Sequence, residues 1–72
     1  MPRVDMAATG ANIAALRKKN NLSVRRLQEL MGLTPQTIFK WQRGECLPTV
    51  DNLVILADLF NVTVNDILVV IK

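Results

Sequence analysis

The chain has 72 residues, enough for one small domain, with a net charge of +3, half of its residues hydrophobic and only three of them aromatic. A single cysteine excludes an internal disulfide, and the lack of histidine excludes a His/Cys zinc site and a Ser/His/Asp catalytic triad. The six carboxylates are scattered and no glycine-rich phosphate loop is present, so we expect no enzyme activity, no cofactor and no metal.

The first predicted element is a helix over about residues 10–20, preceded by an N-terminal arm at residues 1–9. Its last turn carries the basic cluster Arg17 to Lys19, where cations complement the helix dipole. A second helix follows, capped by Ser23 and running through Met31. Gly32 ends this helix.

The third predicted helix is short and starts only two residues later. Thr34 is its cap, Pro35 occupies the first helical position, where a missing N–H costs nothing, and Gly44 marks its end. Two helices separated by Gly32 and Leu33 alone are typical of a helix-turn-helix.

Two further helices are predicted in the C-terminal part. Thr49 caps a helix over residues 50–60, and Thr63 caps a short final helix. Residues 67–72 fit either a helix end or a short strand, since they are rich in β-branched side chains. We find no strand pattern in the body of the chain, and the last four residues, 69–72, form an apolar tail.

The third helix has two chemically different faces. At about 100° per residue, Gln36, Lys40 and Arg43 lie within about 60° of one another, whereas Ile38 and Trp41 lie on the far side. Such a helix packs one face on a core and presents hydrogen-bonding groups on the other. The outward face is suited to a DNA major groove or is a merely solvated surface.

Charge is distributed unevenly along the chain. Residues 1–43 carry a net charge of +6, whereas residues 44–72 carry −3. The basic half fits a polyanion such as a nucleic acid, or is a solvated surface. No apolar run exceeds five residues and no signal peptide is visible, so we expect a cytoplasmic protein without a membrane segment.

An ordered series of apolar, small and capping residues extends over positions 10–68. The series consists of Asn12, Ile13, Leu16, Arg17, Leu22, Ser23, Leu27, Gly32, Leu33, Thr34, Thr37, Ile38, Trp41, Gly44, Leu47, Pro48, Thr49, Leu53, Leu56, Ala57, Val62, Thr63, Asp66, Ile67 and Leu68. In residue types and order it resembles the Cro/C1-type (XRE-type) helix-turn-helix repressor family. The resemblance implies an all-α, compact five-helix, lambda-repressor-like DNA-binding domain. It also implies a transcriptional regulator that binds double-stranded DNA, usually as a homodimer.

The same resemblance implies which residues meet DNA. The base-reading positions of the third helix fall on Gln36, Thr37 and Lys40, and Arg43 near the helix end is positioned for a phosphate. To these we add Thr34, Arg25 and Arg26 as candidate phosphate contacts of this chain's own. Glutamine can pair with adenine through two hydrogen bonds, and lysine can reach guanine or the backbone. Pro35, at the remaining family position, cannot read a base. Phe39 flanks these positions and either contacts a thymine methyl or a sugar, or fills the margin of the core.

Two residues depart from the family pattern. Val24 stands where a phosphate-binding glutamine is common, and Gln28 stands where a small alanine lets the two helices approach. Arg25 and Arg26 could supply the contact that Val24 lacks. Gln28 either hydrogen-bonds across the helix corner or extends to its surface.

Apolar residues in usually polar positions predict a self-association surface or packing against the tail. They are Ile55, Leu59, Val69, Val70 and Ile71. We therefore expect a homodimeric repressor. Two alternatives stay open: an antitoxin-type DNA-binding protein that also binds a toxin partner, and a protein-interaction module on the same fold that has lost DNA binding.

Overall fold

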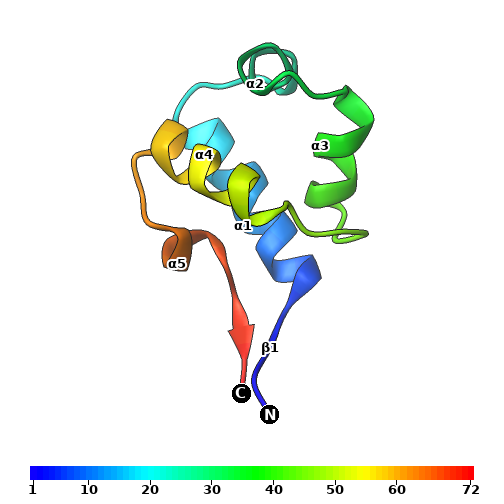
Figure 1. The fold of residues 1–72 in the computed structure, drawn as a ribbon, viewed down its shortest axis with the longest axis vertical. Coiled ribbons are helices and arrows are strands. Elements are labelled where there is room, and N and C mark those ends of the chain that lie inside the picture. Colours follow the sequence, from blue (N-terminus) through cyan, green and yellow to red (C-terminus); the bar gives the residue numbers. More distant parts are fainter.

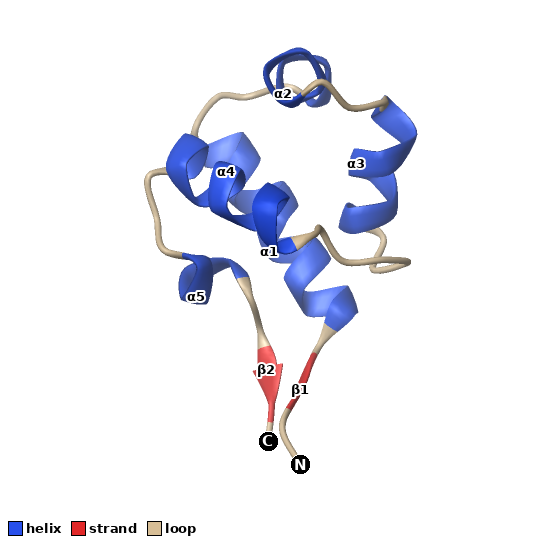
Figure 2. Ribbon diagram, in the orientation of Figure 1, coloured by secondary structure: helices blue, strands red, loops and turns tan.

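The computed structural model describes all residues, 1–72, as five helices and two short strands (Figures 1 and 2). Their bounds are β1 Arg3–Val4, α1 Met6–Lys19, α2 Val24–Met31, α3 Pro35–Gln42, α4 Val50–Phe60, α5 Val64–Ile67 and β2 Val70–Ile71. The predicted five-helix fold is confirmed, with a two-stranded sheet added where the chain ends meet. No helix is long and apolar enough to cross a membrane.

Four of the helices begin at the hydroxyl caps predicted from the sequence. Ser23, Thr34, Thr49 and Thr63 each accept a hydrogen bond from the backbone N–H three residues later, at 3.0, 3.4, 3.2 and 3.2 Å. At the start of α5 the Asp66 carboxylate accepts the Thr63 N–H in return, at 2.9 Å. This backbone hydrogen bond, together with that from the Thr63 side chain, holds the pKa of Asp66 below its usual value.

The first helix starts earlier than predicted. It begins at Met6, not near Gly10, so the segment 1–9 contains a strand and the first turn of α1. The Asp5 carboxylate caps this turn by accepting the Ala8 N–H at 2.9 Å. The sequence-based start was wrong because residues 6–9 carry no helical apolar period, although Asp5 is a good capping residue.

The two ends of the chain are joined by backbone pairing. β1 and β2 are antiparallel, with Val4 opposite Val70, and both ends lie at one pole of the molecule, away from α2 and α3 (Figure 1). The Asp5 N–H donates to the Val69 carbonyl at 2.7 Å, and the Val69 N–H donates to the buried Thr9 hydroxyl at 2.9 Å. The ambiguous tail is therefore extended after α5.

The core is a single aliphatic and aromatic cluster to which every helix contributes. It consists of Ile13, Leu27, Ile38, Trp41, Leu53, Leu56, Ala57, Phe60 and Ile67. α4 supplies four of these residues, which is the apolar stripe expected of a helix that packs across the others. The core fixes α2 and α3 relative to the rest of the domain.

Candidate nucleic-acid interface

The corner between α2 and α3 has the geometry of a helix-turn-helix. Gly32 ends α2 in the left-handed conformation, with a φ of 67°. The N–H groups of Gly32 and Leu33 both donate to the Gln28 carbonyl, which closes the last turn of α2. α3 then begins at Pro35. The predicted corner is confirmed, and it leaves α3 at the surface of the domain.

The outward side of α3 is polar and the inward side is apolar, as the helical wheel predicts. Ile38 and Trp41 are buried in the core, whereas Gln36, Lys40 and Arg43 are exposed. These three exposed residues are called the polar row below. Gln36 and Lys40 make no side-chain hydrogen bond or ion pair within the chain, so their polar groups are free to bind a ligand.

Arg43, the third member of the polar row, has a partner that the sequence did not indicate. Its Nε donates to the Glu45 carboxylate, and both side chains are about half exposed. Ion pairs at the surface contribute about 0–1 kcal/mol. The guanidinium can therefore exchange Glu45 for a phosphate at little cost.

The start of α3 holds the two threonines assigned to DNA. The Thr34 hydroxyl accepts the Thr37 N–H and lies 3.0 Å from the Thr37 hydroxyl. Thr34 is exposed and Thr37 is half-buried. The cap therefore holds both side chains at the N-terminal end of α3, where a helix presents free N–H groups to an anion.

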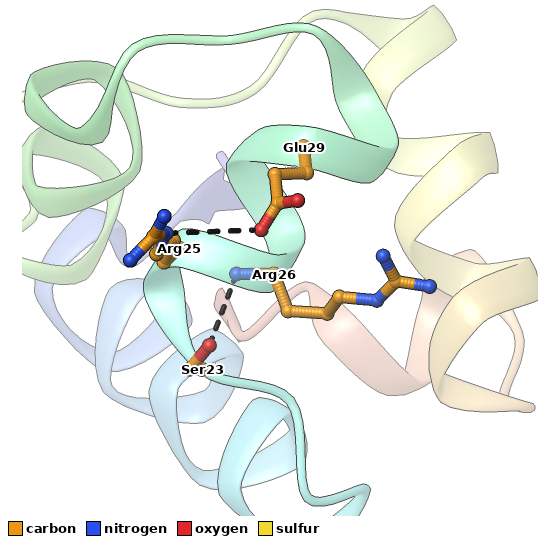
Figure 3. Close-up of polar contacts among 4 residues, drawn as sticks. All are labelled: Ser23, Arg25, Arg26 and Glu29. Carbon is orange, nitrogen blue, oxygen red and sulfur yellow. Dashed lines mark hydrogen bonds and ion pairs between the residues drawn. The ribbon is translucent and has the colours of Figure 1, made fainter.

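Arg25 and Arg26 extend to opposite sides of α2 (Figure 3). The Arg25 Nε lies 3.9 Å from Glu29 Oε1, and the Arg25 side chain is 90% exposed. The backbone N–H of Arg26 donates to the Ser23 cap, and its side chain makes no ion pair. The two guanidinium groups are therefore available, but for different phosphates.

The two departures from the family pattern are accommodated differently. Val24 packs against the core cluster, so its side chain serves the fold. Gln28 is half-buried and its side chain makes no hydrogen bond across the corner. This favours the second expectation for Gln28, that its amide extends to the surface.

The C-terminal end of α3 is held by α1 through contacts that sequence reasoning missed. Arg17 Nε donates to the Gln42 side chain at 3.0 Å, and Arg17 Nη1 donates to the Leu22 carbonyl at 2.8 Å. A Cβ on Gly10 would lie 2.2 Å from the Trp41 carbonyl oxygen, so the backbone of α1 at Gly10 lies directly against the backbone at the end of α3. No local signal separates Arg17 from its neighbours, because Gln42 is distant in sequence.

The residues predicted for self-association do not all lie at the surface. Ile55, Val70 and Ile71 are exposed. Leu59 and Val69 are half-buried, and Leu59 packs against the core. The most exposed apolar side chains of α4 are two that the sequence reading did not select, Val50 at 76% and Val54 at 57%.

Comparison with known proteins now adds to this geometry. A profile of the helix-turn-helix family matches residues 13–67, three quarters of the chain. The chain belongs to this helix-turn-helix family. The XRE-type assignment made from the residue series is thereby confirmed.

Three known proteins are similar to this member of the family. The HTH-type transcriptional regulator AnsR of Bacillus subtilis (strain 168) is 34% identical over 56 residues, which are 78% of this chain and 48% of AnsR. The chain thus spans about half the length of that relative. The DNA-binding domain of BldD has a TM-score of 0.74 and 27% identity, over 89% of this chain and 93% of that one. The restriction-modification controller protein C.AhdI from Aeromonas hydrophila has a TM-score of 0.77 at 24% identity, over 88% and 96%, and shows the shared fold.

Proposed function

We propose that this chain is a sequence-specific DNA-binding transcriptional regulator, acting as a repressor, that inserts α3 in the major groove. The observation that carries the proposal is the polar row, exposed along α3 above a buried apolar face. Gln36 has the donor and acceptor that an adenine matches, and Lys40 can donate to a guanine. The name of the similar protein AnsR supports transcriptional regulation.

Contacts to phosphate would set the position of α3 in the groove. We assign them to Thr34, Arg25, Arg26 and Arg43, with Thr37 at the first turn of α3 serving either a base or a phosphate. Their support is exposure, charge and the net +6 of residues 1–43. Such contacts carry no sequence information, so the choice of operator falls to Gln36, Lys40 and Thr37.

We further propose that the protein acts as a homodimer in the cytoplasm. Ile55, Val70 and Ile71 offer exposed apolar surface, with the half-buried Leu59 and Val69 beside them. A two-fold axis in the acidic C-terminal half would leave both copies of α3 free to enter successive major grooves about 34 Å apart. Asp51, Asp58 and Asp66 would then face away from phosphate, whereas Glu45 lies beside Arg43.

A band-shift titration on random-sequence duplex DNA tests the main proposal. Binding should weaken between about 50 and 200 mM salt, and log affinity should fall with log salt at a slope near −0.9 per phosphate contacted. Selection from the same random pool should then enrich one site. Binding that ignores salt, or no binding at either concentration, contradicts the DNA-binding proposal.

One observation favours a second candidate, an antitoxin-type protein that also binds a partner protein. On α4, Val50 and Val54 lie on one side and Ile55 and Leu59 on the other, separated by the exposed Asp51 and Asp58. A dimer that uses the Ile55 side leaves Val50 and Val54 uncovered. A stable complex with the product of a neighbouring gene, lost in Val54→Glu while DNA binding persists, would favour this candidate.

A further inference from the structure

Phe39 is an exposed aromatic side chain on the DNA-facing side of α3. It is 41% exposed, whereas its neighbour Ile38 is completely buried. Phe39 lies three residues after Gln36 and four before Arg43, so all three side chains share one side of the helix. The expectation that Phe39 fills the margin of the core is therefore the weaker of the two made from the sequence.

The phenyl ring is the one large apolar group on this otherwise polar side of α3. The other large exposed apolar residues lie outside α3, in α2, in the loop before α4, in α4 and near the chain ends. Phe39 carries no polar atom that could hydrogen-bond to a base or a phosphate. Its interaction with DNA is therefore restricted to apolar contact.

In the major groove, the only apolar group that a base pair presents is the C5-methyl group of thymine. Gln36 and Phe39 are separated by about 4.5 Å along the helix axis, and base pairs are stacked about 3.4 Å apart. A helix that sets Gln36 against an adenine therefore brings Phe39 to a base pair one or two steps away. We propose that Phe39 is a specificity-determining residue that packs on a thymine methyl at that step, an inference that rests on the proposed DNA-binding function.

Replacing single thymines by deoxyuridine tests the contact, because this change removes the methyl group and keeps every hydrogen-bonding group of the base pair. The probe is the duplex that the protein selects from a random pool. At one thymine, loss of the methyl should weaken binding by the parent protein about fourfold, the effect of exposing one methyl-sized group. The same replacement should leave the affinity of Phe39→Ala unchanged, which is the signature of a direct pairwise contact.

Two variants serve as controls. Phe39→Leu keeps an apolar side chain and should retain part of the methyl effect. Leu30→Ala removes a large apolar residue of similar exposure, 44%, from the end of α2 and should respond to deoxyuridine as the parent does. Circular dichroism should show that each variant is folded, because both positions are exposed.

The proposal is overturned if no thymine in the selected site shows a methyl effect. It is also overturned if the parent and Phe39→Ala respond equally, because the methyl then acts through DNA shape. In either case, the DNA-binding function itself stands if the parent protein binds in a salt-dependent manner and selects one site from the pool. Failure of the Phe39 proposal can therefore be distinguished from failure of the proposed function. If the parent binds no DNA, the proposed function fails and the inference fails with it.

Discussion

Substituting alanine for Gly10 tests how α1 fixes the recognition helix. The added Cβ would lie 2.2 Å from the Trp41 carbonyl oxygen and 2.8 Å from that of Gln42. Non-bonded atoms need about 3.5 Å, so the two helices would have to separate by roughly 1 Å. A helix interior otherwise prefers alanine to glycine by about 1 kcal/mol. Overpacking costs about 1–3 kcal/mol, and the upper part of this range, about 2–3 kcal/mol, applies because backbone atoms cannot rotate away. After subtraction of the gain in helix propensity, we expect a net loss of about 1–2 kcal/mol.

Urea unfolding followed by circular dichroism measures this loss as a lower midpoint. The matched control is Ala15→Gly, at an exposed position of the same helix, which should cost about 1 kcal/mol through helix propensity alone. Gly10→Ala should also bind DNA more weakly at temperatures where it is folded, because the end of α3 is displaced. A Gly10→Ala protein as stable as the parent, or more stable, would refute the close approach of α1 and α3.

The remaining predictions concern the polar row, the dimer and the capping box. Gln36→Ala should lose about 1–3 kcal/mol on the selected site and little on other DNA, as competition titrations measure; equal losses on both would remove Gln36 from base reading. Arg43→Ala should weaken binding to all duplexes and lower the salt slope by about one. Glu45→Gln should strengthen binding, because it frees Arg43 for a phosphate; titrations of both variants at two salt concentrations measure these effects. Ile55→Glu should give a folded monomer in sedimentation; an unfolded variant would instead place Ile55 in essential packing. Because the folded-state pKa of Asp66 lies below its ordinary value of 3.8, the stability it contributes is present above that pH and is lost as the pH falls through the lowered value. The melting temperature of Asp66→Asn should therefore decline less on acidification than that of the parent.

Local chemistry made most of the helices predictable. The caps at Ser23, Thr34, Thr49 and Thr63 act within three residues, so their signal is contained in short stretches of sequence. The two faces of α3 follow equally from helical geometry. The two-stranded sheet could not be predicted, because it depends on a contact between residues far apart in the sequence. β1 and β2 have two residues each, and they form strands only because the two chain ends lie side by side.

The candidate site divides in the same way. The side on which Gln36 and Lys40 lie could be predicted, because it depends on their spacing from Ile38 and Trp41. The hydrogen-bond and ion-pair partners of the charged residues could not be predicted, because a long, flexible side chain can reach several neighbours and the fold decides which of them it contacts. Arg17 is an example: in the sequence it is one of three consecutive basic residues, whereas in the structure its guanidinium donates to Gln42 and Leu22 and so stabilises the fold.

The pairing of β1 with β2 brings the first and the last residues of the fold together in space. Arg3 and Ile71 face each other across the ladder, so a short linker could join the two termini into a ring without stretching the fold. Closing a loop of this length removes conformational freedom from the unfolded chain, on the order of 4 kcal/mol in the chain-entropy treatment. The closure would lie at the pole of the molecule far from α2 and α3 (Figure 1). A cyclised protein of this kind should therefore keep its α3 surface accessible.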